Sequence, residues 1–147
     1  MSKNSFSMEI IINSTKEEIF KVLTDIESAP LWYTQVLSNE VLTDGPFGVG
    51  TSWKETRKVM FVKATGIAEC VEYEQDSHYK LTIDASSYMA NVRLGVQELS
   101  EGCKVTYDGE CFKKDGDNWI PSEKITKLVS KLDSKMLPAL KSYIEQN

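Results

Sequence analysis

The sequence predicts an α+β domain in which a curved antiparallel sheet of about seven strands wraps around a long C-terminal helix. Two changes in the spacing of apolar residues support this prediction. Between about 41 and 113, apolar residues recur at every second position, which is typical of strands with one buried face. From Ser122 to about Gln146 they recur every three or four residues, as in an amphipathic helix. Two short helices are expected after the first strand.

Length and composition narrow the possibilities. The 147 residues form one domain, 1–147, long enough to bury a core. The net charge of −5 argues against nucleic acid as a partner, because phosphate binding needs a basic surface. The sequence has no apolar run of membrane-span length, and "MSKNSFSMEIIIN" contains no apolar segment of signal-peptide length. We therefore expect a cytoplasmic protein without stable membrane insertion.

The N-terminal part predicts a strand followed by a helix. "FSMEIII" has the composition of a first strand. "NSTKEE" offers two overlapping capping boxes, Ser14 with Glu17 and Thr15 with Glu18, which satisfy free amides at a helix start. Pro30 cannot continue that helix, and "LWYTQV" is expected to form a second helical turn. The apolar stripe of the first helix comprises Ile19, Phe20, Leu23 and Ile26.

The central part alternates between apolar and polar residues in at least three strands. One face of these strands is expected to be buried and the other to face water. The buried positions are Tyr79, Leu81, Ile83, Ala85, Ala90, Val92, Leu94, Val96, Val105, Tyr107 and Gly109.

The C-terminal part predicts one long helix. Its Asp133 is expected to face away from the sheet together with the lysines of this segment, and Pro138 is expected to kink the helix. The apolar stripe comprises Ile125, Leu128, Val129, Leu132, Met136, Leu140 and Tyr143. A single helix is about 10 Å across and cannot fill the concavity of such a sheet. The sequence therefore predicts an internal cavity.

Three stretches resemble a known family. They are the segment from Ile12 to Trp32 with "EEIFKVLTDIESAPLW", the segment "GVGTSW" from Gly48 to Trp53, and "VEYE" from Val71 to Glu74. With the long final helix, they make the chain similar to the START-like (SRPBCC) superfamily. That superfamily comprises the polyketide cyclase/dehydrase and lipid-transport group and has the Bet v 1-like helix-grip fold. The resemblance implies a pocket for a hydrophobic ligand, and implies no particular reaction.

No motif in the sequence indicates catalysis. His78, the only histidine, lies in a turn, and no cluster of histidine, cysteine or acidic residues has the spacing of a metal site. The cysteines Cys70, Cys103 and Cys111 show no Cys-x-x-Cys pattern. We expect no cofactor, no metal and no identifiable catalytic residue.

Three functions remain open. The first is binding or carrying a lipid, quinone or polyketide-like molecule. The second is a cyclase or dehydratase-like activity on a polyketide or other cyclic substrate. The third is an interaction module whose cavity is vestigial. An enzyme should differ from a carrier by holding an acid or base of shifted pKa within reach of the ligand.

Charged residues at inward positions are the strongest candidates for a site. Alternation groups Trp53, Glu55, Arg57 and Val59 on one inward face, and groups Ile67, Glu69, Val71 and Tyr73 on the next. If the intervening turn centres near Val62, Glu55 lies opposite Glu69 and Arg57 lies opposite Ile67. These charges either anchor a ligand in an apolar pocket or reach water where the strands twist at an edge.

On this basis we predict a ligand-binding pocket with apolar walls and with a polar end formed by Arg57 and Glu69. The entrance is expected where Trp32, the loop 45–50 and Pro138 meet. A cavity of several hundred Å³ is expected, in a monomer or a homodimer. The predicted lining comprises Trp32, Trp53, Glu55, Arg57, Glu69, Leu81, Ile83, Val92, Leu94, Tyr107, Leu128, Leu132 and Met136.

Overall fold

The computed structural model describes residues 4–59, 61–86, 88–114 and 121–146. Its elements, in chain order, are β1 (Ser5–Ile12), α1 (Lys16–Thr24), the 3-10 helix η1 (Ile26–Leu31), β2 (Val36–Val41), β3 (Ser52–Val59), β4 (Val62–Glu74), β5 (His78–Ala85), β6 (Tyr88–Glu98), β7 (Cys103–Lys113), α2 (Ser122–Asp133) and α3 (Met136–Glu145). The strands form one antiparallel sheet in the order β1-β7-β6-β5-β4-β3-β2. The predicted α+β fold is therefore confirmed.

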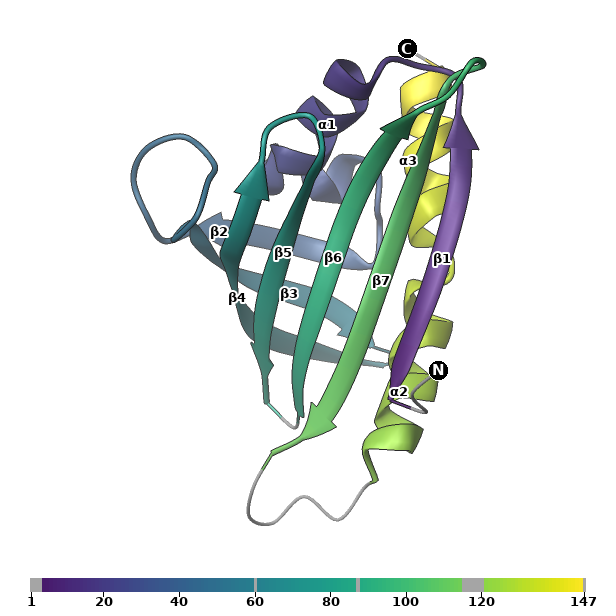
Figure 1. Ribbon diagram of the computed structural model, residues 1–147. Helices are drawn as coiled ribbons and strands as arrows, with labels where there is room; N and C mark the ends of the chain where they lie inside the picture. The colour runs from purple at the N-terminus through teal and green to yellow at the C-terminus, as the bar shows by residue number, and fades with distance from the viewer. Residues whose placement is uncertain (1–3, 60, 87, 115–120, 147) are drawn as a thin grey trace.

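The sheet bends strongly along its width. β1, β7, β6 and β5 run side by side, whereas β2 and β3 lie behind them and cross their direction (Figure 1). α1 and η1 lie at one end of the strands, and α2 followed by α3 runs lengthwise beside β1 and β7 (Figure 1). Helices from both ends of the chain thus cover the concave face. None of the helices in the described ranges is long and apolar enough to cross a membrane.

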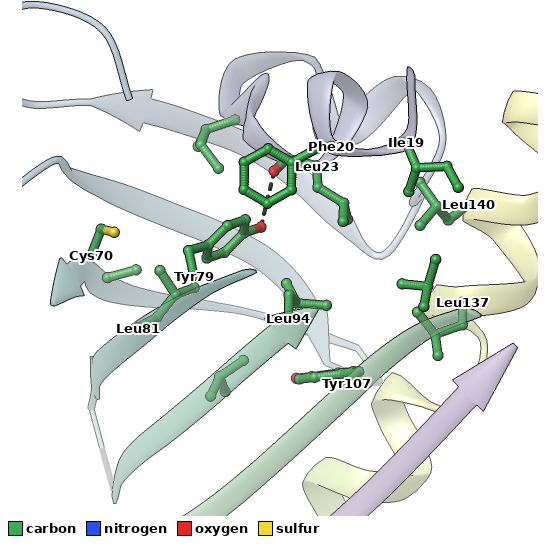
Figure 2. Close-up of a cluster of buried hydrophobic side chains, with 14 of the residues drawn as sticks. Ile19, Phe20, Leu23, Cys70, Tyr79, Leu81, Leu94, Tyr107, Leu137 and Leu140 are labelled. Carbon is green, nitrogen blue, oxygen red and sulfur yellow. Dashed lines mark hydrogen bonds between the residues drawn. The ribbon is translucent and has the colours of Figure 1, made fainter. Parts of the chain in front are cut away.

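The core joins α1 and α3 to the inward face of the sheet. Thr15 caps α1 by accepting a hydrogen bond from the backbone amide of Glu18 at 3.1 Å. The hydroxyl of Tyr79 donates to the carbonyl oxygen of Leu23 at 3.0 Å and so ties β5 to α1 (Figure 2). The alternation predicted for β5, β6 and β7 is correct. The side chains around this contact are Ile19, Phe20, Leu81, Leu94, Tyr107, Leu137 and Leu140 (Figure 2).

The C-terminal helix is interrupted. α2 ends at Asp133 and α3 begins at Met136, so the break lies at Ser134 and Lys135. Pro138 is the third residue of α3, so its missing N–H lies in the first turn of that helix. The predicted interruption of the helix is therefore present, and it lies at Ser134, four residues before Pro138, where a proline removes the bond to the preceding turn.

The buried stripe of α2 also differs from the predicted one. Ile125, Val129 and Asp133 are buried at intervals of four residues. Leu128 is 51% exposed, although the sequence pattern had placed it inside, and Asp133 is only 2% exposed, although the pattern had placed it outside. A charged residue thus occupies a position on the helix that spacing alone would give to an apolar one.

The register between β3 and β4 differs from the predicted one. Val59 pairs with Val62, which places Glu55 opposite Gly66 and Arg57 opposite Ala64. The predicted register is off by an odd number of residues, and such a shift turns every side chain of a strand to the other face. Glu69 therefore lies on the exposed outer face, opposite Ser52, and the prediction that it faces Glu55 inside was wrong.

A β-bulge explains why the pattern of β4 was misleading. The pairing with β5 shifts between Cys70 and Glu72, so Val71 is an extra residue. Before the bulge, small residues including Ala64 and Ala68 face inward and Ile67 is exposed; after it, Tyr73 packs against the core. Only Tyr73 was assigned to the correct face among the residues grouped with it.

The predicted entrance does not form as expected. The loop between β2 and β3, which contains residues 45–50, lies on the opposite side of the molecule from α3 (Figure 1). Its Phe47 packs onto the rings of Trp53, Tyr73 and Tyr79 at centroid distances of 5.0 to 6.0 Å. Because Pro138 belongs to α3, the prediction that it adjoins this loop was wrong.

Candidate ligand-binding site

Two cavities lie between the helices and the sheet. The outer pocket has a volume of about 190 Å³ and lies between α2 and the strands β3 to β6. The inner cavity has a volume of about 90 Å³ and lies deeper, among α1, η1, the strands and Met136. Glu55 and Ile83 line both spaces. The structure thus replaces the predicted single cavity of several hundred Å³ with two smaller ones.

Most of the predicted lining residues surround these two spaces. Glu69 lines neither, because it lies on the outer face of β4. The outer pocket is lined by the predicted residues Glu55, Arg57, Ile83, Leu128 and Leu132. The inner cavity is lined by the predicted residues Trp32, Trp53, Glu55, Leu81, Ile83, Val92, Leu94, Tyr107 and Met136.

Small side chains on two strands leave room for the outer pocket. Ala64 and Gly66 of β4 and Ala85 of β5 line it, and Gly66 pairs with Ala85 across the strands. On the helix side, Ile125 and Leu128 complete an apolar wall. Larger side chains at the three strand positions would fill the space that the bend of the sheet opens.

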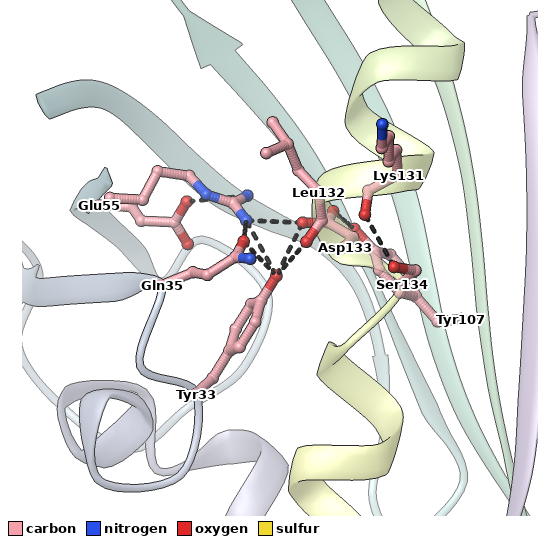
Figure 3. Close-up of polar contacts among 9 residues, drawn as sticks. Tyr33, Gln35, Glu55, Tyr107, Lys131, Leu132, Asp133 and Ser134 are labelled. Carbon is pink, nitrogen blue, oxygen red and sulfur yellow. Dashed lines mark hydrogen bonds and ion pairs between the residues drawn. The ribbon is translucent and has the colours of Figure 1, made fainter. Parts of the chain in front are cut away.

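A buried ion pair lies between the two cavities. Asp133 accepts a hydrogen bond from Arg57 Nη2 at 2.6 Å and from the Tyr33 hydroxyl at 3.0 Å through the same oxygen, Oδ1. Its other oxygen, Oδ2, accepts from the Tyr107 hydroxyl at 2.6 Å. Figure 3 shows Tyr33, Tyr107 and Asp133 converging from three separate parts of the chain. Both carboxylate oxygens are therefore occupied.

Arg57 keeps unused hydrogen-bond donors beside this ion pair. Its Nη1 lies 3.7 Å from Glu55 Oε1, which is an ion-pair contact longer than a hydrogen bond. Its guanidinium carbon lies 5.7 Å from the centre of the Tyr33 ring. Its Nε is buried and has no partner in the described part of the chain. Arg57 also lines the outer pocket, so this unsatisfied donor belongs to a side chain that borders the space for a ligand.

Burial shifts the acidity of the groups around Arg57. Desolvation and the neighbouring Asp133 carboxylate raise the pKa values of Tyr33 and Tyr107, so both phenols stay protonated and act as donors. Burial also raises the pKa of Glu55, with Arg57 opposing part of that rise. Burial raises the pKa of Tyr88, in the outer pocket, to about 12.

The inner cavity contains two further polar atoms without partners. Trp32 and Asn39 line this cavity; the donor Trp32 Nε1 and the acceptor Asn39 Oδ1 are buried, and neither makes a hydrogen bond to a described residue. The amide nitrogen of Asn39 is satisfied, because it donates to the carbonyl of Ile26 at 2.9 Å. Buried polar atoms are usually paired, so these two are places where a bound group would find complementary partners.

The sequence analysis missed three members of this site. Asp133 was placed on the exposed face of the helix, and Tyr33 and Gln35, in the segment "LWYTQV", were given no role in binding. Gln35 Oε1 lies 3.2 Å from the Tyr33 hydroxyl and 3.4 Å from Arg57 Nη2. One signal was present, since Asp133 follows Val129 by four residues on the apolar stripe.

The site offers recognition by hydrogen bonds in an apolar surrounding. Within the described residues, no group of three or more histidine, cysteine or acidic side chains is placed to hold a metal ion. Asp133 has its oxygens engaged by three donors, which leaves Glu55 as the acidic group that faces both cavities. The arrangement can therefore orient a carbonyl or hydroxyl group.

A family model described as polyketide cyclase / dehydrase and lipid transport matches residues 3–145. The chain belongs to this family. Its sequence has no significant match among curated proteins.

Solved structures with the same fold are only distantly similar in sequence. A START superfamily protein from Mycobacterium smegmatis superimposes with a TM-score of 0.82 at 14% identity, with 97% of each chain covered. The Zhui aromatase/cyclase from Streptomyces gives a TM-score of 0.80 at 9% identity, covering 97% of this chain and 93% of that one. Ara h 8.0201 gives 0.75 at 19% identity, covering 97% and 98%. At such identities the likeness shows the fold alone.

Proposed function

We propose that this family member binds a hydrophobic or amphipathic small molecule between α2 and the sheet, without converting it chemically. The observation that carries the proposal is the outer pocket, whose walls are apolar and whose polar end holds Arg57 with a buried, unused Nε donor. Such a pocket, mostly apolar with a few convergent polar groups, is typical of small-molecule sites. A lipid, a quinone or a polyketide-like molecule has the matching combination of hydrocarbon and carbonyl or hydroxyl oxygen.

The energetics favour a ligand with an acceptor group. A buried polar group without a partner costs about 1 to 3 kcal/mol, and an acceptor placed at Arg57 Nε removes that cost. Contact with Ile125 and Leu128 adds about 25 cal/mol for each Å² of apolar surface removed from water. Hydrophobic contact thus supplies affinity and Arg57 supplies orientation.

The cavity volumes restrict how a ligand is held. Small-molecule sites usually measure about 300 to 1,000 Å³, more than the outer pocket of about 190 Å³ provides. Glu55 and Ile83 line both cavities, so movement of these two side chains joins the outer pocket to the inner cavity. A bound ligand then extends into the inner cavity, near Trp32 Nε1 and Asn39 Oδ1, which make no hydrogen bond to a described residue.

Binding is favoured over a cyclase or dehydratase-like activity by the state of the acidic groups. Asp133 is held by Arg57, Tyr33 and Tyr107 and lines neither cavity, so a ligand in these spaces does not contact its carboxylate. The two phenols have raised pKa values and serve Asp133 as donors. The choice between binding and catalysis is tested at Glu55. An enzyme that uses Glu55 as an acid or base would lose its activity in the Glu55→Gln variant.

The decisive experiment combines native mass spectrometry with a filled-pocket variant. Native mass spectra of freshly purified protein are expected to show a bound small molecule. Ala85→Phe places a large side chain in the outer pocket, whereas Thr82→Phe, on the outer face of the same strand, is the matched control. We expect Ala85→Phe to lose the bound molecule and to weaken binding of 1-anilinonaphthalene-8-sulfonate about tenfold or more, with Thr82→Phe unchanged. Equal binding by the wild type and Ala85→Phe would overturn the proposal.

A further inference from the structure

We propose that one face beside the mouth of the outer pocket docks on the surface of an anionic lipid bilayer. The docking face consists of the tip of the β3–β4 hairpin and the adjoining exposed side of α2. This inference goes beyond ligand binding, and it does not require the pocket to be occupied. The residues of the docking face are Lys58, Phe61, Val62, Lys63, Lys124, Lys127, Leu128 and Lys131.

Large apolar side chains project from this face. Phe61 is 97% exposed and Val62 is 64% exposed, at the tip where β3 turns into β4. Leu128 is 51% exposed on α2 and lines the outer pocket. An aromatic ring that is almost fully in water gives the fold nothing through burial, but it is well suited to enter the boundary between lipid head groups and acyl chains.

Basic side chains flank these apolar residues along the chain, with Lys58 and Lys63 on the outer side of the hairpin and Lys124 and Lys131 on α2. Lys58 and Lys63 are both exposed and directly opposite each other in the β3–β4 register, a like-charge pair that disfavours the hairpin. Within the described ranges, neither of them forms an ion pair with an acidic residue. On α2, Lys124 and Lys131 lie on the same side as Leu128 because they are separated from it by four and three residues. Anionic head groups would relieve this concentration of positive charge.

The distribution of charge along the chain favours an anionic bilayer as the partner of the docking face. Segments 54–65 and 122–135 together contain eight basic and three acidic residues, whereas the remaining chain contains nine basic and nineteen acidic residues. A negative membrane therefore attracts these segments and repels the rest of the molecule, which orients the protein with the docking face toward the bilayer. A second copy of the same positive face would be repelled, so charge favours a bilayer over a dimer contact.

The position of the docking face gives it a functional consequence. Val59 and Ala64, just inside the hairpin tip, line one side of the outer pocket, and Lys124 and Leu128 line the other. Figure 1 shows the end of β3 close to α2. Docking therefore turns the pocket mouth toward the lipid phase, and an apolar ligand passes between pocket and membrane without crossing water.

Vesicle co-sedimentation tests the inference directly. The full chain is mixed with phosphatidylcholine vesicles that either contain or lack about one third phosphatidylglycerol. We expect binding to the anionic vesicles that weakens with added salt, and much weaker binding to the neutral ones. Phe61→Ser should weaken binding about ten- to a hundredfold. The matched control is Val49→Ser, since Val49 is 69% exposed in the β2–β3 loop on the other side of the molecule.

A charge variant gives an independent measurement. Lys58→Ser with Lys63→Ser should weaken binding to anionic vesicles about twenty- to thirtyfold. Lys16→Ser with Lys21→Ser on α1 removes the same charge from the other end of the molecule and serves as control. Loss of the like-charge pair should leave the hairpin variant at least as stable as the wild type in urea, which separates weaker docking from unfolding.

Three outcomes would overturn the inference. The first is no binding to anionic vesicles, and the second is equal binding by the wild type and Phe61→Ser. The third is a concentration-dependent dimer that Phe61→Ser dissociates in analytical ultracentrifugation, which would show that a second copy covers the tip. Ala85→Phe, with its outer pocket filled, should dock like the wild type, so docking and ligand binding can fail independently.

Discussion

Asp133→Asn is the substitution that tests the buried ion pair most directly. Asp133 is 2% exposed and is bonded by Arg57 Nη2 at 2.6 Å and by two tyrosine hydroxyls. Asparagine keeps the shape of the side chain and one acceptor oxygen, but it removes the charge opposite Arg57. The substitution therefore leaves a largely buried guanidinium with only its longer contact to Glu55, at 3.7 Å, as a counter-ion.

The expected loss of stability follows from the exposure of the two partners. Removing one member of a buried ion pair usually costs about 3 to 5 kcal/mol. The Arg57 side chain is 17% exposed and is partly solvated, so we expect the lower end, about 3 kcal/mol. Domains are typically stable by about 5 to 15 kcal/mol. The melting temperature should fall by roughly 6 to 12 °C for a domain of this size.

Equilibrium unfolding in urea, followed by tryptophan fluorescence, measures this loss. Arg57→Met and the double variant with Asp133→Asn complete a double-mutant cycle, in which the double variant should be less destabilised than the two single losses predict by about 1.5 kcal/mol or more. Asp84→Asn is the matched control, because Asp84 forms an exposed ion pair with Lys114 and should change stability by less than about 1 kcal/mol.

Two results would refute this reasoning. A loss of less than about 1 kcal/mol in Asp133→Asn would mean that water or Glu55 compensates the charge of the guanidinium in the folded protein. Strictly additive losses in the cycle would mean that Arg57 and Asp133 do not stabilise each other and that the tyrosine hydroxyls hold Asp133 in place.

Three further predictions concern backbone strain and acidity. Gly102 has a φ of +80°, and a Cβ there would lie 2.5 Å from the carbonyl oxygen of Ile12. Gly102→Ala should therefore lower the free energy of unfolding, measured in urea, by about 2 kcal/mol or more. Gly48→Ala is the control and should be neutral, because the space around Gly48 is open. The folded state binds a proton on Glu55 more readily than the unfolded state does, so stability from this group falls as pH rises through its raised pKa. Glu55→Gln should therefore stabilise the protein at pH 8, with a gain that shrinks toward pH 4; a constant difference would contradict this. Because burial raises its pKa to about 12, Tyr88 should ionise near pH 12 instead of 10. The ionisation is measured as an absorbance change at 295 nm that Tyr88→Phe lacks. The contribution of Tyr88 to stability is lost as pH rises through that range.

The sequence predicted those strands whose inward residues are large. In β5 and β6, Leu81, Ile83, Val92 and Leu94 alternate with polar residues, and a period of two determines the face without ambiguity. β4 could not be predicted in this way, because its inward residues are small and Ile67 on its outer face is apolar. The bulge at Val71 then reversed the alternation within one strand, and such a bulge has no unique sequence signal.

The sequence predicted only those site residues whose orientation follows from alternation within a single strand. Glu55 and Arg57 were placed correctly because alternation within β3 decides their orientation. Asp133 was misplaced because charge suggested solvent, although its spacing from Val129 indicated the buried stripe. The contact between Tyr33 and Asp133 joins residues 100 positions apart, and no local pattern determines such a meeting.

The small residues around the outer pocket allow the size of the ligand that fits there to change without a change in the stability of the fold. Side chains on a strand alternate between faces, so Ala64 and Ala85 can each be enlarged without disturbing the outer surface. Gly66 between them has less freedom, because a Cβ there would lie 3.3 Å from the backbone oxygen of Asp84 and the two strands would have to shift slightly. Adaptation to a bulkier or slimmer compound can therefore proceed by single substitutions at 64 and 85 without a change at 66.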